Sequence, residues 1–159
     1  MTVDAVEEPF RTQLTVRLRQ GDTLLGVPLP GPCTFTSGNG IDILWMGPDE
    51  YLVLGLELSR ESSDLEAELS RESSVLAVVD VSAQRNVYRL TGVHAADVLA
   101  HGCAIDLEVA PVGTCVQTLL ARTGIVLMVR EDGFTVLVRQ SFSDYFRAWL
   151  ADASLEYVS

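Results

Sequence analysis

Lysine is absent from this sequence. All 11 basic residues are arginine, they stand against 22 acidic residues, and the formal net charge is −11. Without lysine the chain has no Walker-type phosphate lysine, no Schiff-base lysine and no lysine general base. A chain this acidic repels phosphate backbones and anionic lipid, so we expect neither nucleic acid nor a membrane as a partner.

Cysteine is scarce, and long apolar runs are missing. Cys33, Cys103 and Cys115 are odd in number and lack CxxC spacing, which argues against a disulfide framework and a zinc site. No apolar run approaches the roughly 20 residues that a membrane helix needs. Residues 1–10 are acidic and do not resemble a signal peptide. We therefore expect a soluble cytoplasmic protein with buried thiols.

Hydrophobic residues are plentiful, at 48% of 159 residues, so the chain can bury a sizeable core. Residues 1–10 are expected to form a flexible acidic tail. No linker marks a boundary in residues 11–159, which predicts a single domain, with two small α/β lobes as the alternative.

The hydrophobic pattern predicts an α+β fold with mostly antiparallel sheets and a few helices. A ferredoxin-like βαββαβ unit fits the chain from Tyr51 onward. The hairpin of residues 41–46 and 51–56 is expected to turn through the four residues 47–50. Strands are predicted at residues 11–19, 41–46, 51–56, 75–81, 86–90, 114–121, 124–130, 134–139 and 155–158, and helices at 62–74, 93–101 and 141–151.

Local signals mark the ends of these helices. Ser62 or Ser63 is expected to cap the first helix, and Gly102 stands where a glycine commonly ends the second. Ser141 and Asp144 resemble a capping box with Asp in place of Glu at the start of the last helix.

Residue types that carry chemistry do not form a recognisable site. His94 and His101 are seven residues apart, about 10.5 Å along a helix, which is too far to share one ion. With Asp97 they instead form the polar stripe of an amphipathic helix. Cys103 has no family-type flank, and the Asp49-Glu50 pair is typical of a turn. We therefore expect no catalytic, cofactor-binding or metal-binding residue in this chain.

Aromatic residues provide the most informative local pattern. Phe142, Tyr145, Phe146 and Trp149 follow the i, i+3, i+4, i+7 spacing of one helix face. The stripe either faces the core or offers an edge, Trp149 above all, to a partner protein, since aromatic side chains are enriched in interface cores.

A turn between two predicted strands holds a candidate charge pair, Asp80 with Arg85. They either brace this turn or are solvated independently, and the Ser82 hydroxyl can close the turn onto the backbone.

Several segments resemble the sarcosine oxidase gamma subunit family. Residues 44–55, LWMGPDEYLVLG, are similar to the family's LW-x-GPDE-W/Y-L segment, with Tyr51 where Trp is common. The family's order continues through VDVS at residues 79–82, Arg85, LTG at 90–92 and IDL at 105–107. It closes with VRQSF at residues 138–142, where Gln140 separates an Arg and a Ser that are often adjacent.

This resemblance implies a subunit of heterotetrameric sarcosine oxidase, with alpha, beta and delta subunits as partners. Such complexes oxidise sarcosine to glycine, pass a one-carbon unit to tetrahydrofolate and release hydrogen peroxide. In the family, FAD, FMN and NAD belong with the alpha and beta subunits and zinc with delta. The gamma subunit has no assigned catalytic residue, and its fold is similar to the folate-binding domain of aminomethyltransferases and YgfZ.

Two functions remain open. The chain is either a non-catalytic assembly subunit or a stand-alone folate-binding, aminomethyltransferase-like module, for which Glu50, Asp80 and Asp106 are candidate pterin partners. For the first function, the acidic face of the helix in residues 62–74 is expected to stay solvated, because like charge opposes docking. The expected partner interface uses large amphipathic side chains: Trp45, Tyr51, Tyr145, Phe146 and Trp149.

Overall fold

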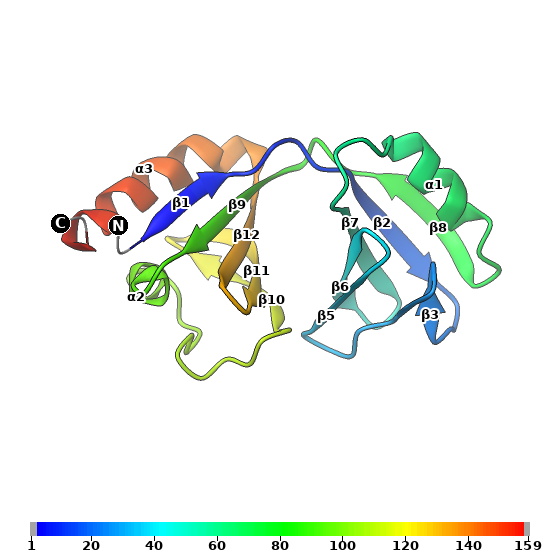
Figure 1. The fold of residues 1–159 in the computed structure, drawn as a ribbon, viewed down its shortest axis with the longest axis horizontal. Coiled ribbons are helices and arrows are strands. Elements are labelled where there is room, and N and C mark those ends of the chain that lie inside the picture. The colour runs from blue at the N-terminus through cyan, green and yellow to red at the C-terminus, as the bar shows by residue number, and fades with distance from the viewer. Residues whose placement is uncertain (1–2, 158–159) are drawn as a thin grey trace. The chain divides into compact units, whose positions relative to one another are not determined.

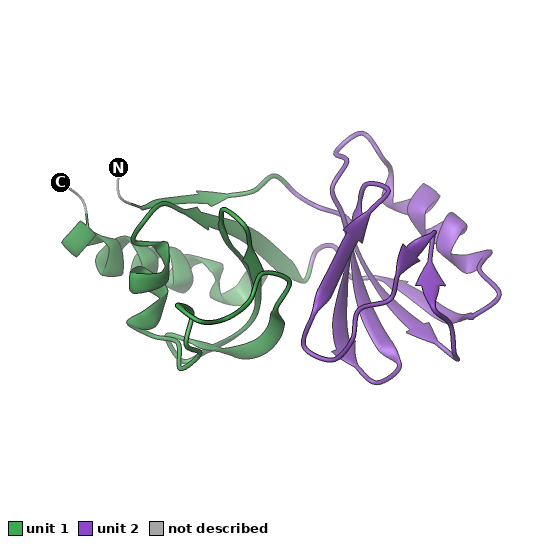
Figure 2. Ribbon diagram, turned by 60° about the horizontal axis from the view of Figure 1, so that its bottom comes forward, with its two compact units in different colours: residues 1–9, 84–159 green, residues 10–83 purple. Residues whose placement is uncertain are grey.

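The computed structural model describes residues 3–157 of the chain. The chain divides into two compact units, unit 1 of residues 1–9 and 84–159 and unit 2 of residues 10–83 (Figure 2). Each unit has its own five-stranded sheet and its own cluster of buried apolar side chains. The sequence left open a single domain or two small α/β lobes, and the structure has two compact units.

Unit 2 contains an antiparallel sheet with the strand order β5-β6-β7-β2-β8 (Figure 1). Helix α1, Ser62–Ser70, lies in sequence between β7 and β8. The strands are β2 Gln13–Leu18, β5 Phe35–Gly38, β6 Ile41–Gly47, β7 Glu50–Gly55 and β8 Val75–Asp80, with a separate ribbon of β3 Thr23–Leu24 and β4 Val27–Pro28.

The strand and helix periodicities of the sequence both place apolar side chains in the core of unit 2. Leu14, Val16 and Leu18 alternate along β2 and are all buried, as the strand pattern predicts. Leu65 and Leu69, four residues apart on α1, join the same cluster. Burial of one such leucine contributes about 1.5–3 kcal/mol, so these positions define the register of strand and helix.

Three local expectations for unit 2 are wrong. Helix α1 is capped by Glu61, without a side-chain cap hydrogen bond, because Ser62 and Ser63 already have helical conformation. The helix also ends at Ser70, so residues 71–74, which were predicted as helical, form a turn that leads into β8. In the hairpin, Gly47 pairs with Glu50, which shortens the predicted four-residue connection to two residues.

Unit 1 contains a second antiparallel sheet, with the order β1-β9-β12-β11-β10 (Figure 1). Its strands are β1 Asp4–Glu7, β9 Arg85–Thr91, β10 Cys115–Leu120, β11 Thr123–Arg130 and β12 Gly133–Arg139. Its helices are α2 Ala95–Ala100, α3 Ser143–Ser154 and the 3-10 turns η1 Gln140–Phe142 and η2 Leu155–Tyr157.

The core of unit 1 lies between one face of this sheet and the two α-helices. Val98 and Leu99 of α2 and Phe146 and Leu150 of α3 pack with alternate sheet residues. The sheet contributes buried side chains from four strands: Tyr88, Leu90, Leu120, Ile125, Leu127, Val129, Phe134, Val136 and Val138.

The N-terminus is a strand where the sequence predicted a flexible tail. Asp4–Glu7 form β1, which pairs antiparallel with residues 88–91 of β9. All four β1 residues are exposed, so the segment carries no hydrophobic alternation that could reveal a strand. Backbone pairing with β9, rather than side-chain burial, places this segment in the sheet.

The C-terminal region also differs from the prediction. Residues 155–157 form the 3-10 turn η2 in place of a last strand, and Val158 lies outside the described residues. Helix α3 is capped by Phe142 without a side-chain cap hydrogen bond, so the capping box of Ser141 and Asp144 does not form. A full helical turn of the 3-10 type precedes the helix and shifts its start to Ser143.

The predicted fold class is confirmed: each sheet is antiparallel, and the helices are few and short. The elements from β7 to β10 follow the order of a βαββαβ unit. Their strands are divided between two sheets, however, and β2 lies between β7 and β8. Within residues 3–157, no helix is long and apolar enough to cross a membrane.

Candidate functional site

The aromatic stripe of α3 divides between the core and the surface of unit 1. Phe146 is fully buried and meets Tyr88 edge-to-face, with ring centroids 4.9 Å apart. Trp149 is half-buried and stacks on Phe146 at 6.4 Å. Phe142 and Tyr145 are half-exposed. The core-facing interpretation therefore holds for Phe146, while the other three rings keep exposed area.

Tyr145 is oriented by a tight turn beneath it. Its hydroxyl donates to the backbone oxygen of Ala121 at 2.8 Å. Ala121 and Arg122 connect β10 to β11 with φ angles of +52° and +69°, a conformation uncommon for residues with a side chain. Because this hydrogen bond anchors one end of the ring, its exposed edge has a defined orientation.

The hairpin in unit 2 holds the other two candidate interface aromatics. Trp45 and Tyr51 are cross-strand partners in β6 and β7. Tyr51 is buried and Trp45 is half-buried, and both pack on the core of unit 2. Tyr51 therefore has almost no surface to offer, whereas Trp45 keeps an accessible edge.

The acidic side chains at this hairpin are partly neutralised. Arg17 lies 3.3 Å from Asp49 and 3.8 Å from Glu50. This contact agrees with the turn-forming interpretation of the Asp49-Glu50 pair. Glu50 is also one of the three candidate pterin partners, and its carboxylate lies beside Arg17. Of the others, Asp106 accepts a hydrogen bond from the Glu108 backbone at 3.2 Å.

Asp80 closes the end of β8 through Ser82. Its carboxylate accepts from the Ser82 backbone N–H at 2.9 Å and lies 2.6 Å from the Ser82 hydroxyl. These hydrogen bonds, the side-chain one first, lower the pKa of Asp80 below its ordinary value of 3.8. The Ser82 hydroxyl also accepts from the Gln13 backbone at 2.9 Å, so the serine ties this turn to β2. The charge pair of Asp80 with Arg85 stays a prediction.

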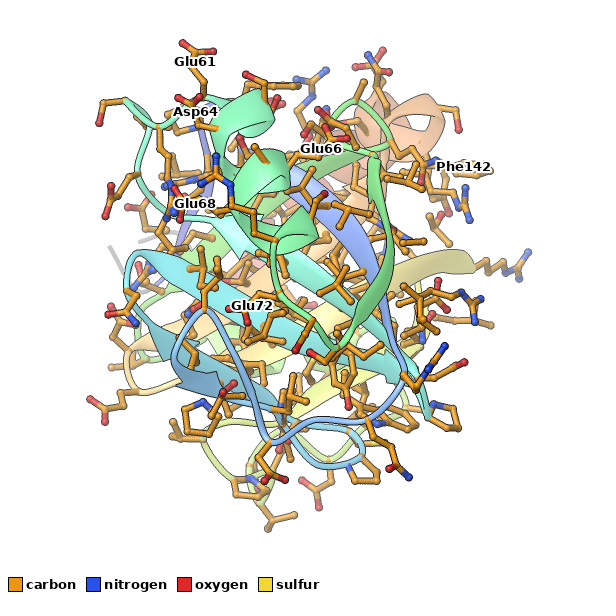
Figure 3. The ribbon with its side chains drawn as sticks, turned by 90° about the vertical axis from the view of Figure 1, so that its right-hand side faces the viewer. Glu61, Asp64, Glu66, Glu68, Glu72 and Phe142 are labelled. Atoms are coloured by element: carbon orange, nitrogen blue, oxygen red, sulfur yellow. The ribbon has the colours of Figure 1, made fainter. Side chains whose placement is uncertain are left out.

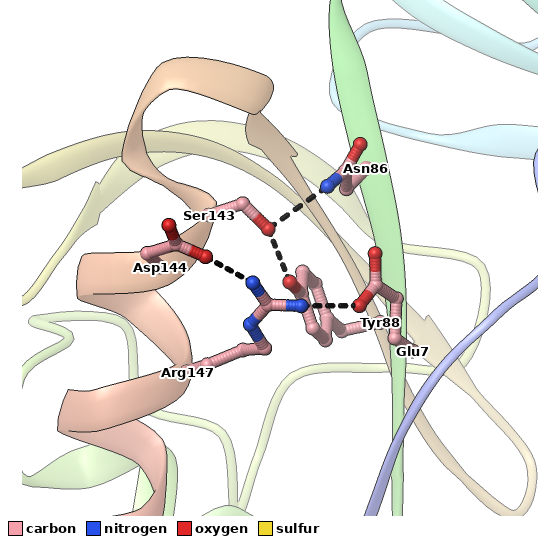
Figure 4. Close-up of polar contacts among 6 residues, drawn as sticks. All are labelled: Glu7, Asn86, Tyr88, Ser143, Asp144 and Arg147. Carbon is pink, nitrogen blue, oxygen red and sulfur yellow. Dashed lines mark hydrogen bonds and ion pairs between the residues drawn. The ribbon is translucent and has the colours of Figure 1, made fainter.

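A polar network that the sequence analysis missed joins α3 to the sheet of unit 1 (Figure 4). The Ser143 hydroxyl hydrogen-bonds to the buried Tyr88 hydroxyl and accepts from Asn86 at 2.9 Å. Arg147 forms ion pairs with Asp144 on its own helix and, at 2.9 Å, with Glu7 of β1. The partners of Ser143 are more than 50 residues away in sequence, so no local pattern could have revealed them.

This network lacks the arrangement of a nucleophilic site. Ser143 is bonded to a phenol and an amide, and neither group is a general base for a hydroxyl at neutral pH. We interpret the network as structural, since its hydrogen bonds satisfy the buried Tyr88 and Ser143 hydroxyls.

The two histidines lie beside the C-terminal turn. His94 Nδ1 is 2.6 Å from Asp97, and its ring stacks on Tyr157 at 4.9 Å. His101 Nε2 is 3.2 Å from the Tyr157 hydroxyl. Among the described residues, no three His, Cys, Asp or Glu side chains are grouped so that they could hold a metal ion.

The acidic residues around α1 have mixed roles (Figure 3). Glu61 and Asp64 are exposed. Glu68 forms an ion pair with Arg60 at 2.5 Å, and Glu72 accepts from the Leu25 backbone at 3.0 Å. Part of the acidic charge is therefore used within unit 2, and the remainder is presented to solvent.

Comparison with known proteins gives concordant results. Residues 16–156 match the family described as sarcosine oxidase, gamma subunit family. The chain is similar to the sarcosine oxidase subunit gamma of Corynebacterium sp. (strain P-1), with 33% identity over 99% of this chain and 83% of the relative. It is also similar to the subunit gamma of an Arthrobacter species, with 34% identity over 96% of this chain and 80% of the relative.

A solved structure has the same fold. It is the heterotetrameric sarcosine oxidase from Corynebacterium sp. U-96 in complex with pyrrole 2-carboxylate, one chain of which superposes with a TM-score of 0.83 and 32% identity. The superposition covers 99% of this chain and 86% of that chain.

Proposed function

Because the chain belongs to the sarcosine oxidase gamma subunit family, we propose that it is the gamma subunit of a heterotetrameric sarcosine oxidase. The observation that carries this proposal is the extent of the similarity: residues 16–156 match the family, and this range includes most of both units. The similar solved chain is part of a heterotetrameric sarcosine oxidase, and the match covers 86% of that chain.

Within that complex, the chain supports the reaction without performing chemistry itself. The complex oxidises sarcosine to glycine, transfers the one-carbon unit to tetrahydrofolate and releases hydrogen peroxide. The alpha, beta and delta subunits are the partners, and FAD, FMN, NAD, zinc and tetrahydrofolate bind to them. In the gamma chain, the Ser143 network and the His94–Asp97 pair serve internal packing.

The partner interface uses the aromatic side chains that keep exposed area. These are Tyr145 and Trp149 on α3 and Trp45 on the β6–β7 hairpin. Phe146 and Tyr51 are left out because both are buried in the cores of their units. A specific interface buries about 800 Å² per partner, so rigid aromatic edges of this kind are well suited to contribute.

Co-expression with the other three subunits tests the proposal. With an affinity tag on the flavin-binding large subunit, the gamma chain is expected to be retained in a stoichiometric complex that forms peroxide from sarcosine. A gamma chain that stays entirely in the unbound fraction, while the other subunits assemble without it, would contradict the proposal.

A further inference from the structure

The turn between β10 and β11 holds two residues in an unfavourable backbone conformation. Leu120 and Thr123 are cross-strand partners, so Ala121 and Arg122 alone form the connection. Their φ angles are +52° and +69°, and positive φ at both central positions is the requirement of a type I′ turn. Such turns favour Asn-Gly or Gly-Gly, because most other side chains are strained in this conformation. Contacts outside the hairpin must therefore stabilise this one.

Two hydrogen bonds hold the turn from outside the hairpin. The Tyr145 hydroxyl of α3 donates to the Ala121 oxygen at 2.8 Å, and the Ala121 N–H donates to the Gly102 oxygen at 3.1 Å. Gly102 in turn lies against Trp149, whose ring would be 2.8 Å from a Cβ at this position. Strained backbone persists where its surroundings over-determine it, and it is concentrated at functional positions. The turn thus has a fixed position against α3, with Arg122 exposed at its tip.

The charge of Arg122 is not balanced within the part of the chain that the structure describes. The residue is exposed, and among residues 3–157 its side chain has neither an ion pair nor a hydrogen bond. Helix α3 carries two acids, of which Asp144 is paired with Arg147. The other, Asp152, is seven residues beyond Tyr145, about 10.5 Å along the helix. The guanidinium donors are therefore available to a group from outside the chain.

We propose that Arg122, together with Tyr145 and Trp149, binds the carboxylate of an Asp or Glu side chain of a partner subunit. These three residues are the Arg122 surface. The inference rests on the proposed function, because it requires an assembled complex. A guanidinium fork binds a carboxylate through two parallel hydrogen bonds, and Arg, Tyr and Trp are the residue types enriched at interface hot spots. Tyr145 is 50% exposed and Trp149 is half-buried, so both rings keep area that can exclude water from the ion pair.

A partner subunit fits the Arg122 surface better than a second copy of the chain or a free small anion. The chain has a net charge of −11, so two copies repel each other as they approach. A partner subunit needs to present only one carboxylate at this position. Small-ligand pockets enclose most of the ligand surface, whereas an exposed arginine covers a carboxylate from one side only. A docked protein supplies the remaining enclosure itself.

The test is a pull-down titration of the gamma chain on the tagged complex of the other subunits. Arg122→Asn removes the guanidinium, and asparagine tolerates positive φ better than arginine, so the turn is expected to be kept. The apparent affinity is expected to fall about tenfold at low salt, because charged hydrogen bonds are lost. This difference should shrink at about 1 M salt, where the Debye length is about 3 Å. Arg122→Lys keeps the charge but not the fork, so an intermediate loss is expected.

Arg122→Gly separates binding from a merely structural role. Glycine adopts positive φ without strain, so the thermal midpoint of the isolated chain is expected to be kept or raised while the affinity falls as in Arg122→Asn. A lower midpoint of both variants would show that the side chain stabilises the turn itself, and would contradict the inference. Arg19→Asn is the matched control, since it removes the charge of an exposed arginine in unit 2, and it is expected to behave as wild type.

Four further results would overturn the inference, each for a different reason. If wild type is not retained, the proposed function fails and this inference fails with it. If wild type is retained and Arg122→Asn and Arg122→Gly bind as tightly, only the inference fails. An equal loss with Arg19→Asn would attribute the effect to net charge. If the isolated wild-type chain forms a dimer that Arg122→Asn abolishes, while both bind the complex equally, the surface binds a second copy instead.

Discussion

Gly102 lies directly against the ring of Trp149. A Cβ on this glycine would come within 2.8 Å of Trp149 Cζ2 and 2.9 Å of the Ala121 backbone nitrogen. The position after α2 thus requires glycine because of a close approach between elements. Gly102 follows α2 where a glycine commonly ends a helix, but it is not among the glycines with positive φ, so the close contact rather than a left-handed conformation requires glycine here.

Gly102→Ala is expected to destabilise the isolated chain by about 1–3 kcal/mol, because the added methyl group must displace Trp149 or the Ala121 backbone. Urea unfolding measures this loss. Gly124→Ala is the matched control in the same unit, where a Cβ meets no atom within 4 Å. Equal stability of the two variants would contradict the close packing of Gly102.

Trp149→Ala is expected to reduce both stability and assembly. The ring is half-buried on Phe146, so the loss of unfolding free energy should fall somewhat below the roughly 3–5 kcal/mol of a fully buried aromatic residue. Its exposed edge is proposed to meet a partner subunit, so co-purification should also decline. Measurements are thermal unfolding of the isolated chain and retention on the tagged complex.

Tyr145, on the same helix, allows its contribution to stability to be measured separately from its contribution to assembly, through the variant Tyr145→Phe. It removes the hydrogen bond to Ala121 and keeps the ring, and a cost of about 1 kcal/mol in stability is expected. Retention that survives Tyr145→Ala and Trp149→Ala alike would place the interface elsewhere on the chain.

Asp80 is expected to make stability depend on pH in the acid range. Its folded-state pKa is lowered by Ser82, so its contribution is present above the unfolded-state value of about 3.9 and is lost as pH falls through the folded-state value. Asp80→Asn should therefore lower the thermal midpoint at pH 7, and its difference from wild type should shrink below about pH 4. A difference that stays constant down to pH 2 would argue against ionisation of Asp80 as the cause.

The predicted pairing of Asp80 with Arg85 is tested by a double-mutant cycle. Asp80→Asn and Arg85→Gln should each destabilise the chain, and the double variant should cost less than their sum. Additive effects in urea unfolding would show that the two charges act independently.

The purified chain is expected to be colourless and to contain neither flavin nor zinc at one equivalent, since the proposed cofactor sites belong to the partner subunits. Absorbance spectra and metal analysis of the isolated chain measure this. Titration with a reduced folate should give no saturable binding. Tight folate binding would favour the stand-alone module over the assembly subunit.

The sequence by itself determined much of the local structure. Alternation of Leu14, Val16 and Leu18 identified β2, and Leu65 with Leu69 identified the buried face of α1. These patterns can be recognised because strand and helix geometry fix which neighbouring residues share a face. Motifs from residue 44 to residue 142 likewise indicated the family that the comparisons confirmed.

Only the tertiary structure decided which residues from distant segments meet. Exposed β1 has no hydrophobic signal, and it becomes a strand because β9 offers an edge to pair with. The same aromatic stripe buries Phe146 and leaves Tyr145 half-exposed, because only part of the stripe packs against the core of unit 1. Arg85 and Arg139 are 54 positions apart and become neighbours only through the register of β9 with β12. Strand pairing depends on the free energy of the whole sheet, which no local pattern records.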